Sequence, residues 1–323
     1  MGVPRKNTPE RIIPKLVIGL MLGIIVMACF LLFSDLKQIT HSISIMPKHW
    51  LVLAFLLTFG SYCFRLWKWH AFSRWSNFKI SFKDNTAIFF IGLMMSITPG
   101  KAGELIKSYL LQKKGDIAYS DSLPVVIYDR LTDLLAMMAL VGIGLLVYPF
   151  GLTSLIGLLL LILLIAIVIQ KKSWMTALID KLTSHGKLQR FNEPLHSFYR
   201  QTLSLMRFRI LSFSFVISFI AWFLECGSLY VLIYGFGAEL SLPASILTFS
   251  LGTIAGALSM IPGGLGAAEG SITGLLVYFG LSGSLAVTVS LVVRFVTLWF
   301  GVILGIIVFL SKRKSFFSSS NNF

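Results

Sequence analysis

Uncharged apolar runs of 18 or more residues recur along this chain of 323 residues, and they limit what it can fold into. About 20 such residues in a helix cross the roughly 30 Å hydrocarbon core of a bilayer. Only 13% of the residues are charged, whereas an ordinary soluble domain has about 25%. The sequence therefore predicts an all-α protein with several membrane-spanning helices.

The first apolar run, residues 16–33, follows four basic residues, as the apolar part of a signal peptide would. It is longer than that part usually is, and it lacks a small-residue cleavage site. We therefore expect it to be retained as the first spanning helix.

A Pro-Gly pair interrupts an apolar run at two widely separated places, at Pro99 and at Pro262. Each pair is followed by at least one more glycine and then by a glutamate. A later apolar run then holds an arginine at nearly the same spacing, Arg130 after Pro99 and Arg294 after Pro262. Proline removes a backbone donor and glycine permits unusual turns, so we expect the helix to break at each pair. Two broken helices at corresponding places in two halves indicate a transporter built from repeats, with its site near the bilayer midplane.

The placement of the 28 basic residues, which give a net charge of +15, indicates the orientation. Basic residues favour cytoplasmic loops. We therefore expect a multi-pass protein of the bacterial cytoplasmic (inner) membrane with both termini in the cytoplasm, and no nucleic-acid partner. The basic residues gather before residue 16 and in 65–83, 101–114, 171–209 and 312–314, whereas 235–285 has none.

With the N-terminus inside, the chain has about six spanning helices and two broken hairpins. Residues 86–98 and 104–112 are each too short to span, so we expect a re-entrant hairpin from the cytoplasmic side and a second one, 243–281, from the other side. The two halves then form an inverted repeat. An alternative with eight spanning helices stays open, because 243–261 is long enough to cross. The predicted spans are 16–33, 51–67, 123–148, 152–169, 210–234 and 285–310.

A single membrane domain, 1–323, contains all these elements. The segment 173–209 mixes basic and apolar residues at helical spacing, which fits helices in the headgroup region and a solvated linker equally well. The predicted parts are a first helix 16–33, half A 51–148, a connecting helix and cytoplasmic interfacial segment 149–209, half B 210–310, and a cytoplasmic tail 311–323.

Seven charged residues lie within or beside the apolar runs. A charge at the centre of a membrane helix costs roughly 2.5–3.5 kcal/mol, so these residues must pair or face water. Arg130 can reach Asp133 one helical turn away. Either these are structural ion pairs, or an arginine is presented to a lipid phosphate while carboxylates limit its affinity; for Arg294 a structural partner would be Glu225 or Glu269. The seven are Glu104, Asp129, Arg130, Asp133, Glu225, Glu269 and Arg294.

Each break frees backbone groups, which at membrane depth is tolerated only inside protein or beside a water-filled cavity. A helix that restarts there presents N–H groups and a positive dipole end, which suit a phosphate. Glu104 and Glu269 lie in those first turns, where they can cap the helix, bind a cationic headgroup or exchange a proton. We predict lipid-headgroup binding by Arg130, Arg294, Gly100, Gly103, Gly263, Gly264 and Gly266, and charge balance or proton coupling by Glu104, Asp129, Asp133, Glu225 and Glu269.

Three motifs together resemble the lysylphosphatidylglycerol synthase transmembrane-region family, over most of the chain. This family includes the flippase half of bacterial multiple peptide resistance factors. The resemblance implies a module that moves or presents lipids, such as aminoacylated phosphatidylglycerol or polyprenyl-linked sugars. The family pattern often has Glu where this chain has Asp129. The motifs are Thr98-Pro99-Gly100-x-x-Gly103-Glu104-x-x-Lys107, Asp129-Arg130-x-x-Asp133 and Pro262-Gly263-Gly264-x-Gly266-x-x-Glu269.

Enzymes of this kind carry a large soluble catalytic domain after the membrane part, whereas nine residues follow Lys314 here. The glycine-rich stretch near Gly263 lacks the Lys-Ser/Thr of a P-loop, and the cysteines and histidines form no metal set. We therefore expect a lipid flippase or scramblase without a cofactor or metal. The alternatives are a membrane-embedded lipid-modifying enzyme and a non-transporting partner of a glycosyltransferase.

The expected partners follow from this function. They are anionic phospholipids or polyprenyl-phosphate lipids, with a lipid-modifying enzyme and a second copy of the chain as candidate protein partners.

Overall fold

The computed structural model describes residues 44–98, 103–148, 167–184 and 186–317, together with a few positions between 153 and 164. The predicted first helix 16–33, the helix-breaking Pro99 and the neighbouring Gly100 lie outside the described residues, as does most of the predicted helix 152–169. Within the described ranges, every regular element is a helix, and short turns and loops join the helices. This confirms the all-α prediction.

In the part of the chain that the structure describes, four helices are long and apolar enough to cross a membrane. At 1.5 Å per residue, a helix of about 28 residues is roughly 42 Å long, more than the ~30 Å hydrocarbon core requires. These helices correspond to four of the six predicted spans, with longer bounds. They are α3 (Lys48–Trp75), α6 (Tyr119–Val147), α10 (Phe208–Gly235) and the continuous helix formed by α13 (Gly283–Arg294), the π-helical η5 (Phe295–Trp299) and α14 (Phe300–Phe317).

Two pairs of short helices lie between the long ones, at the predicted breaks. The longest of the four, α11, has 17 residues and is about 26 Å long, so it falls short of the ~30 Å core. This length favours broken hairpins over the alternative with eight spans. The first pair is α4 (Phe82–Met94) and α5 (Ile106–Gly115), with the 3-10 turn η1 (Met95–Ile97) after α4. The second pair is α11 (Leu242–Leu258) and α12 (Ala267–Tyr278), with the 3-10 turn η4 (Pro262–Gly264) between them.

The two halves repeat one another closely. Helices α3 and α10 both have 28 residues, and they begin at Lys48 and at Phe208. The hairpin that follows each of them begins with a capping serine, Ser81 in half A and Ser241 in half B, at the same offset in numbering as the helix starts. The hydroxyl of each serine accepts a hydrogen bond from the backbone N–H three positions on, which satisfies one of the donors that a helix start leaves open. The same local device therefore starts both hairpins.

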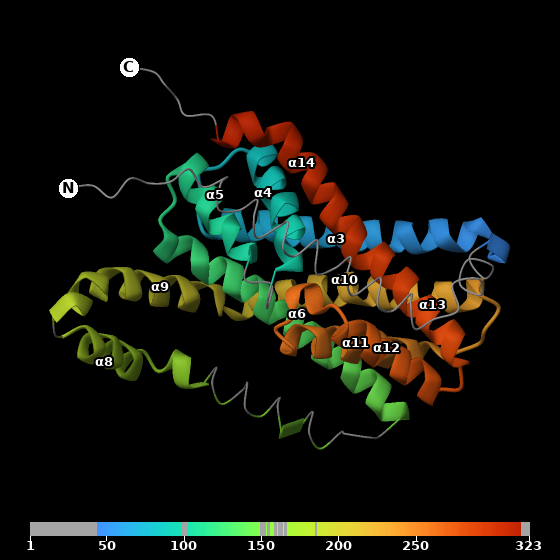
Figure 1. Ribbon diagram of the computed structural model, residues 1–323. Helices are drawn as coiled ribbons and strands as arrows, with labels where there is room; N and C mark the ends of the chain where they lie inside the picture. Colours follow the sequence, from blue (N-terminus) through green and yellow to red (C-terminus); the bar gives the residue numbers. More distant parts are fainter. Residues whose placement is uncertain are drawn as a thin grey trace.

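Helices α3 and α10 pack against each other along their length and run in opposite directions (Figure 1). The Thr58 hydroxyl is 3.1 Å from that of Ser228, and the Lys68 ammonium is 2.7 Å from the Ser218 hydroxyl. One residue number rises as the other falls, which is the mark of antiparallel packing. Positions 58 and 218 are equivalent in the two halves, as are 68 and 228. The two contacts are thus related by a pseudo-two-fold axis.

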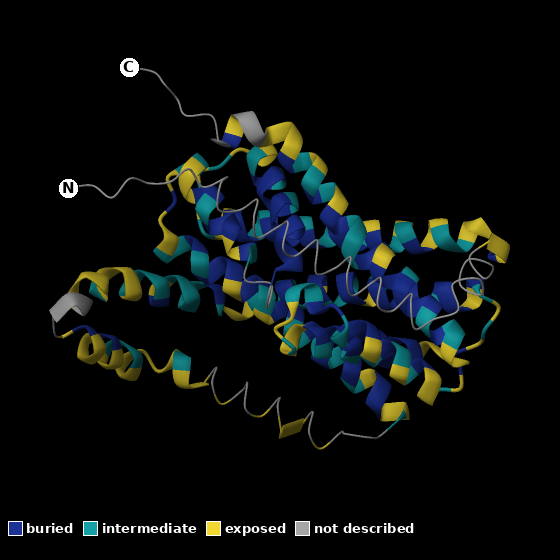
Figure 2. Ribbon diagram, viewed as in Figure 1, coloured by how far each residue is buried: buried dark blue, intermediate teal, exposed yellow. Residues whose placement is uncertain are grey.

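Each half covers the hairpin of the other half. Helix α6 packs on α11, and α14 packs on α4. Glycines permit both close approaches, because Gly144 lies against Leu247 and Gly305 lies against Met94. The tips of the hairpins, η1 and η4, contact each other at the centre, where buried residues concentrate (Figure 2). The repeat therefore places η1 and η4 side by side in the core.

The segment between the halves forms α8 (Lys172–Thr183), η3 (Gly186–Phe191) and α9 (Asn192–Leu205). In Figure 1 these helices extend beyond the bundle at the end where α4 and α5 lie. Helix α9 packs on α6, and α8 packs on α9. Trp174, Leu178 and Leu182 form an exposed apolar stripe on α8. Such a stripe beside basic residues is typical of helices at a membrane surface.

Paired cysteines test the antiparallel packing of α3 and α10. We expect Thr58→Cys with Ser228→Cys, in a chain whose native cysteines are replaced, to form a disulfide on oxidation, because the two native hydroxyls are 3.1 Å apart. Cleavage between α8 and α9 followed by a non-reducing gel measures the link. The control pair, Thr58→Cys with Ser218→Cys, should stay unlinked, and its cross-linking would indicate parallel packing instead.

Candidate functional site

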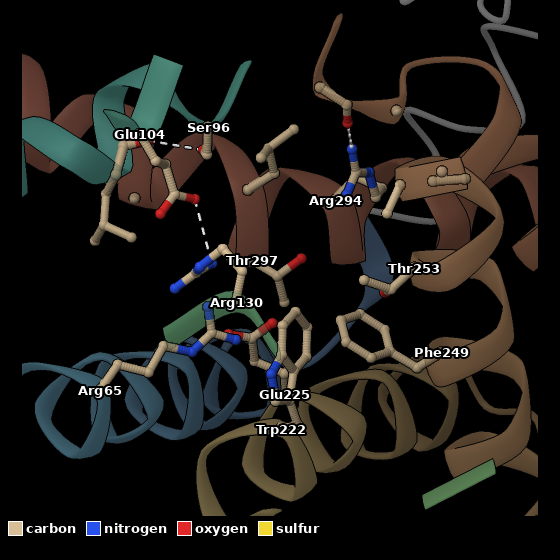
Figure 3. Close-up of a pocket in the computed structure, with 18 of the residues that line it drawn as sticks. Arg65, Ser96, Glu104, Arg130, Trp222, Glu225, Phe249, Thr253, Arg294 and Thr297 are labelled. Carbon is tan, nitrogen blue, oxygen red and sulfur yellow. Dashed lines mark hydrogen bonds and ion pairs between the residues drawn. The ribbon is translucent and has the colours of Figure 1, made fainter. Parts of the chain in front are cut away.

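A cavity of about 60 Å³ lies where the two hairpin tips meet. That volume admits several water molecules, at ~10–15 Å³ of accessible volume for each. Its wall comes from both halves: α3 and α6 with the first tip, and α10, α11 and α13 with the second (Figure 3). Of the described residues, three arginines and two glutamates line it, namely Arg65, Arg130, Arg294, Glu104 and Glu225. The cationic groups therefore outnumber the anionic groups on its wall.

Arg130 connects the cavity to a buried charge cluster in half A. Its guanidinium is 2.7 Å from Asp129, 3.0 Å from Asp133 and 3.2 Å from Glu104. The Arg130 side chain is 26% exposed, whereas its three carboxylate partners are at most 3% exposed. The predicted pair of Arg130 with Asp133 is present. Arg130 is thus the member of the cluster that is most accessible.

Two lysines complete this cluster. The Lys68 ammonium is 2.8 Å from Asp129 and 2.6 Å from Asp133. The Lys107 ammonium lies 3.3 Å from Glu104 and 3.4 Å from Asp129. Both lysine side chains are completely buried. Three cations therefore face three carboxylates, so the cluster is balanced in charge. Its six members are Lys68, Glu104, Lys107, Asp129, Arg130 and Asp133.

The Lys107 side chain packs against two aromatic rings and a glycine on its way to the cluster. Its ammonium lies 4.7 Å from the centre of the Trp69 ring and 5.5 Å from that of Phe89. A methyl group on Gly92 would overlap the Lys107 side chain, so glycine is needed at that place. Cation–π attraction is strongest where water is excluded. The rings thus help hold a cation that burial alone would destabilise.

In half B the equivalent position has a simpler arrangement. The Arg294 Nε donates to Glu269 at 2.7 Å, and its Nη2 donates to the carbonyl of Gly263 at 2.6 Å. The second oxygen of Glu269 accepts from the Gly266 N–H at 2.7 Å. Glu269 therefore caps the restarting helix α12 and pairs with Arg294 at the same time, two roles that the sequence left open.

The third ion pair lies between the halves, close to the pseudo-two-fold axis. Arg65 and Glu225 occupy equivalent positions in α3 and α10, and their side chains are 2.8 Å from each other. Ser61 also donates to Glu225 at 2.9 Å, and the Arg65 guanidinium stacks 4.0 Å from the centre of the Trp222 ring. The sequence offered Glu225 as a partner for Arg294. The structure pairs it with Arg65.

The sequence analysis missed Arg65, Lys68 and Lys107, because it assigned them to basic cytoplasmic segments. A signal for the first two was present. Thr58, Ser61, Arg65 and Lys68 recur every three or four residues, which places them on one face of a helix. Such a polar stripe along an apolar helix indicates a buried interface.

The glycines of the second tip have the backbone conformation that only glycine adopts easily. Gly263, Gly264 and Gly266 have φ angles of 64°, 65° and 84°. Pro262 begins the short turn that holds them. Gly264 also packs directly on the backbone of Gly256 in α11, where a side chain would collide.

The tip amides that the sequence offered to a headgroup are engaged within the protein. The Gly103 N–H donates to the Thr98 hydroxyl at 2.6 Å, and the Gly264 N–H donates to the Ile261 carbonyl at 2.9 Å. With the Gly266 N–H on Glu269, three of the predicted donors hold the shape of the tips. The arginines are therefore the donors most available to a ligand.

A π-helical turn follows Arg294 directly. The hydroxyl of Tyr62 in α3 donates to the carbonyl of Thr297 within this turn, and Gly301 leaves room for the Tyr62 ring. An inserted side chain accounts for a bulge in the helical ladder, and such bulges occur often at functional sites. This contact fixes the helix that carries Arg294 to α3.

In the described part of the chain, no group of three or more His, Cys, Asp or Glu side chains has an arrangement that could hold a metal ion.

Comparison with known proteins identifies the family. The profile described as "Lysylphosphatidylglycerol synthase TM region" matches residues 17–305. The chain belongs to this family. It is a multi-pass membrane protein, and the resemblance inferred from the three motifs is confirmed.

Relatives from archaea bear the name "UPF0104 membrane protein". One from Methanothermobacter thermautotrophicus is 22% identical over 89% of this chain and 92% of its own length. One from Pyrococcus horikoshii is 25% identical over 82% of this chain and 89% of its own length. A shorter match to a Methanothermobacter protein is 35% identical, but covers 40% of this chain and 39% of that relative.

Removal of one buried cation tests the balance of the cluster. Lys68→Met leaves Asp133 without its nearest cation and takes one cationic partner from Asp129, and breaking a buried pair costs about 3–5 kcal/mol. We expect Lys68→Met with Asp133→Asn to recover much of that loss, because the cluster is neutral again. Thermal unfolding of the purified proteins in detergent measures the loss of stability in the single variant and its recovery in the double variant.

Arg200→Gln is the control for this measurement. Its pair with Glu193 is exposed, 60% for Arg200 and 77% for Glu193, so the loss should be below ~1 kcal/mol. If the single and double variants of the cluster were equally destabilised, charge balance would not be what holds it together.

Proposed function

We propose that this protein moves a lipid between the two leaflets of the membrane, as a flippase or scramblase. The lipid headgroup would bind in the cavity between the hairpin tips, while its acyl chains stay in the bilayer. The observation that carries this proposal is the presence of three arginines from both halves, against two glutamates, on the wall of that cavity.

Arginine suits a phosphate-bearing headgroup. Its planar guanidinium carries five N–H donors and matches the geometry of phosphate oxygens. Arg130 is partly exposed, and the carboxylates around it limit its affinity, so a bound headgroup can leave again. A phospholipid, including aminoacylated phosphatidylglycerol, and a polyprenyl-phosphate lipid share this chemistry. The substrate class is therefore a lipid with a phosphate in its headgroup.

Transport would require the two halves to move relative to each other. A cavity of about 60 Å³ holds several water molecules, which is less than a complete lipid headgroup needs. The tips η1 and η4 and the pair of Arg65 with Glu225 join the halves across it. In transporters built from inverted repeats, one half rocks against the other around a central site. Separation of the tips would enlarge this site.

The basic ends of the bundle support a location in the cytoplasmic membrane, with both termini on the cytoplasmic side. The hairpin α4–α5 ends in Lys113 and Lys114, whereas no basic residue lies in 235–285 around the other hairpin. We place α4–α5 toward the cytoplasm and α11–α12 toward the outside.

Cysteine labelling in cells tests this orientation. A membrane-impermeant thiol reagent should label Ser282→Cys, in the turn after α12, in cells whose cytoplasmic membrane is intact and whose outer envelope admits the reagent. It should label Gln112→Cys, at the end of α5, only after the cells are broken, because that hairpin faces the cytoplasm. Both positions are exposed. Labelling of both from the same side would refute entry of the hairpins from opposite faces.

Lipid exposure in proteoliposomes tests the transport function. We expect Arg130→Gln with Asp133→Asn, which keeps the cluster neutral, to slow translocation of a labelled phospholipid at least about tenfold, because a hydrogen bond to a charged group contributes ~1.5–3 kcal/mol. Arg294→Gln with Glu269→Gln should have a similar effect. Arg200→Gln, on the surface, is the matched control. If the folded double variants translocated the labelled phospholipid at the native rate, Arg130 and Arg294 would not take part in transport.

Lipid profiles of a deletion strain separate this function from the alternatives. A missing flippase leaves every lipid species present but on the wrong leaflet, whereas a missing lipid-modifying enzyme removes a species. A non-transporting partner would copurify with an enzyme and tolerate loss of the buried charges.

A further inference from the structure

Among the described residues, the charged side chains in and around the cavity sum to zero, which constrains what can enter it. Five carboxylates are buried in this region, and five cationic side chains pair with them. A headgroup with one net negative charge would add an uncompensated charge to a region of low dielectric, which is costly. It must therefore bring or attract a positive charge. The ten are Arg65, Lys68, Lys107, Arg130 and Arg294 with Glu104, Asp129, Asp133, Glu225 and Glu269.

Glu104 is the carboxylate with the longest ion-pair contacts. It lies 3.2 Å from Arg130 and 3.3 Å from Lys107. The other four carboxylates each have a cationic partner at 2.8 Å or less. Glu269, its counterpart in the second half, also caps a helix. By these distances, Glu104 is the least tightly paired of the five.

Glu104 also lies where a proton and a ligand can affect each other. It lines the cavity and is 2% exposed. Lys107 faces it from its own hairpin and Arg130 faces it from α6, and Asp129 on α6 pairs with both of these cations. The other ionisable groups on the cavity wall are Arg65 and Tyr62 on α3, Glu225 on α10 and Arg294 on α13. A phosphate that binds Arg130 would compete with Glu104 for one of its two cations.

We propose that Glu104 takes up one proton when an anionic lipid headgroup binds Arg130, so that lipid and proton enter the site together. This inference rests on the proposed function, because it needs a lipid phosphate at Arg130. The proton comes from water, an O–H bond forms on the Glu104 carboxylate, and no other covalent bond changes. The summed charge then returns to zero.

Two consequences separate this mechanism from simple anion binding. Binding of an anionic lipid weakens as the pH rises, because the bound state holds one more proton than the free state. A zwitterionic headgroup carries its own positive charge and needs no proton. With an anionic substrate, transport would thus move a proton along with each lipid.

Calorimetry counts the proton directly. Dihexanoyl-phosphatidylglycerol, an anionic lipid, is titrated into the full chain in detergent at one pH, in several buffers that differ in ionisation enthalpy. The slope of the observed enthalpy against the buffer enthalpy gives the protons taken up per lipid. Dihexanoyl-phosphatidylcholine, which is zwitterionic, is the matched ligand. The variants are Glu104→Gln and, as its matched control, Glu193→Gln on the exposed surface, which makes the same chemical change outside the site.

We expect uptake near one proton per phosphatidylglycerol and near zero per phosphatidylcholine. Glu104→Gln should still bind phosphatidylglycerol, with uptake near zero and little dependence on pH, whereas Glu193→Gln, on the exposed surface, should keep the uptake. Binding of phosphatidylglycerol to the native chain without proton uptake overturns the proposal, even if no variant folds. Unchanged uptake in Glu104→Gln overturns the assignment to this residue.

The same titration shows separately whether the proposed function fails. If Arg130→Gln with Asp133→Asn binds phosphatidylglycerol as tightly as the native chain, the headgroup is not held at Arg130. The proposed site and the proton mechanism are then both wrong. If this variant loses binding but the native chain takes up no proton, the site stands and only the proton mechanism falls.

Discussion

Pairing of charges away from water is the interaction on which the rest of this structure depends. An unpaired charge inside a membrane protein costs more than most local contacts can offset. Each cation therefore fixes the position of the element that carries its partner. Lys68 joins α3 to α6, Lys107 joins α5 to α6, and Arg65 joins α3 to α10. Apolar packing alone specifies the register of membrane helices weakly, because lipid is as apolar as the side chains. Here the charges specify it.

The pairing also explains why a broken hairpin is stable at membrane depth. Backbone groups freed by a break need partners inside the protein. At the second tip, Arg294 donates to the Gly263 carbonyl, and Glu269 accepts from the Gly266 N–H. One ion pair thus satisfies one acceptor and one donor of the broken backbone. At the first tip, the Thr98 hydroxyl accepts from the Gly103 N–H instead. The symmetric scaffold therefore carries asymmetric chemistry.

The sequence predicted the fold more fully than the site. Apolar runs and the two Pro-Gly pairs act locally, so four of the six predicted spans and the pairs of short helices between them are found in the described residues. Helix ends were less certain: the predicted span 51–67 is a helix from Lys48 to Trp75, because Arg65 and Lys68 are buried rather than at its end. Their identity as basic residues indicated a loop, and only the carboxylates of distant α6 and α10 reverse that inference. A partner on a helix far along the chain leaves no mark on the local pattern.

The arginines of the cavity have more hydrogen-bonding capacity than the protein uses. In the described residues, the Nε atoms of Arg65 and Arg130 are buried and have no hydrogen-bond acceptor. A guanidinium that serves only as a structural ion pair gains from having all its donors satisfied, and buried polar groups usually are satisfied. Arg294, in contrast, uses its Nε and an Nη on Glu269 and the tip carbonyl. The unfilled donors lie on the two helices, α3 and α6, that bring the balanced cluster to the cavity. A phosphate, whose oxygens accept several hydrogen bonds at once, is the kind of group that this unfilled capacity suits.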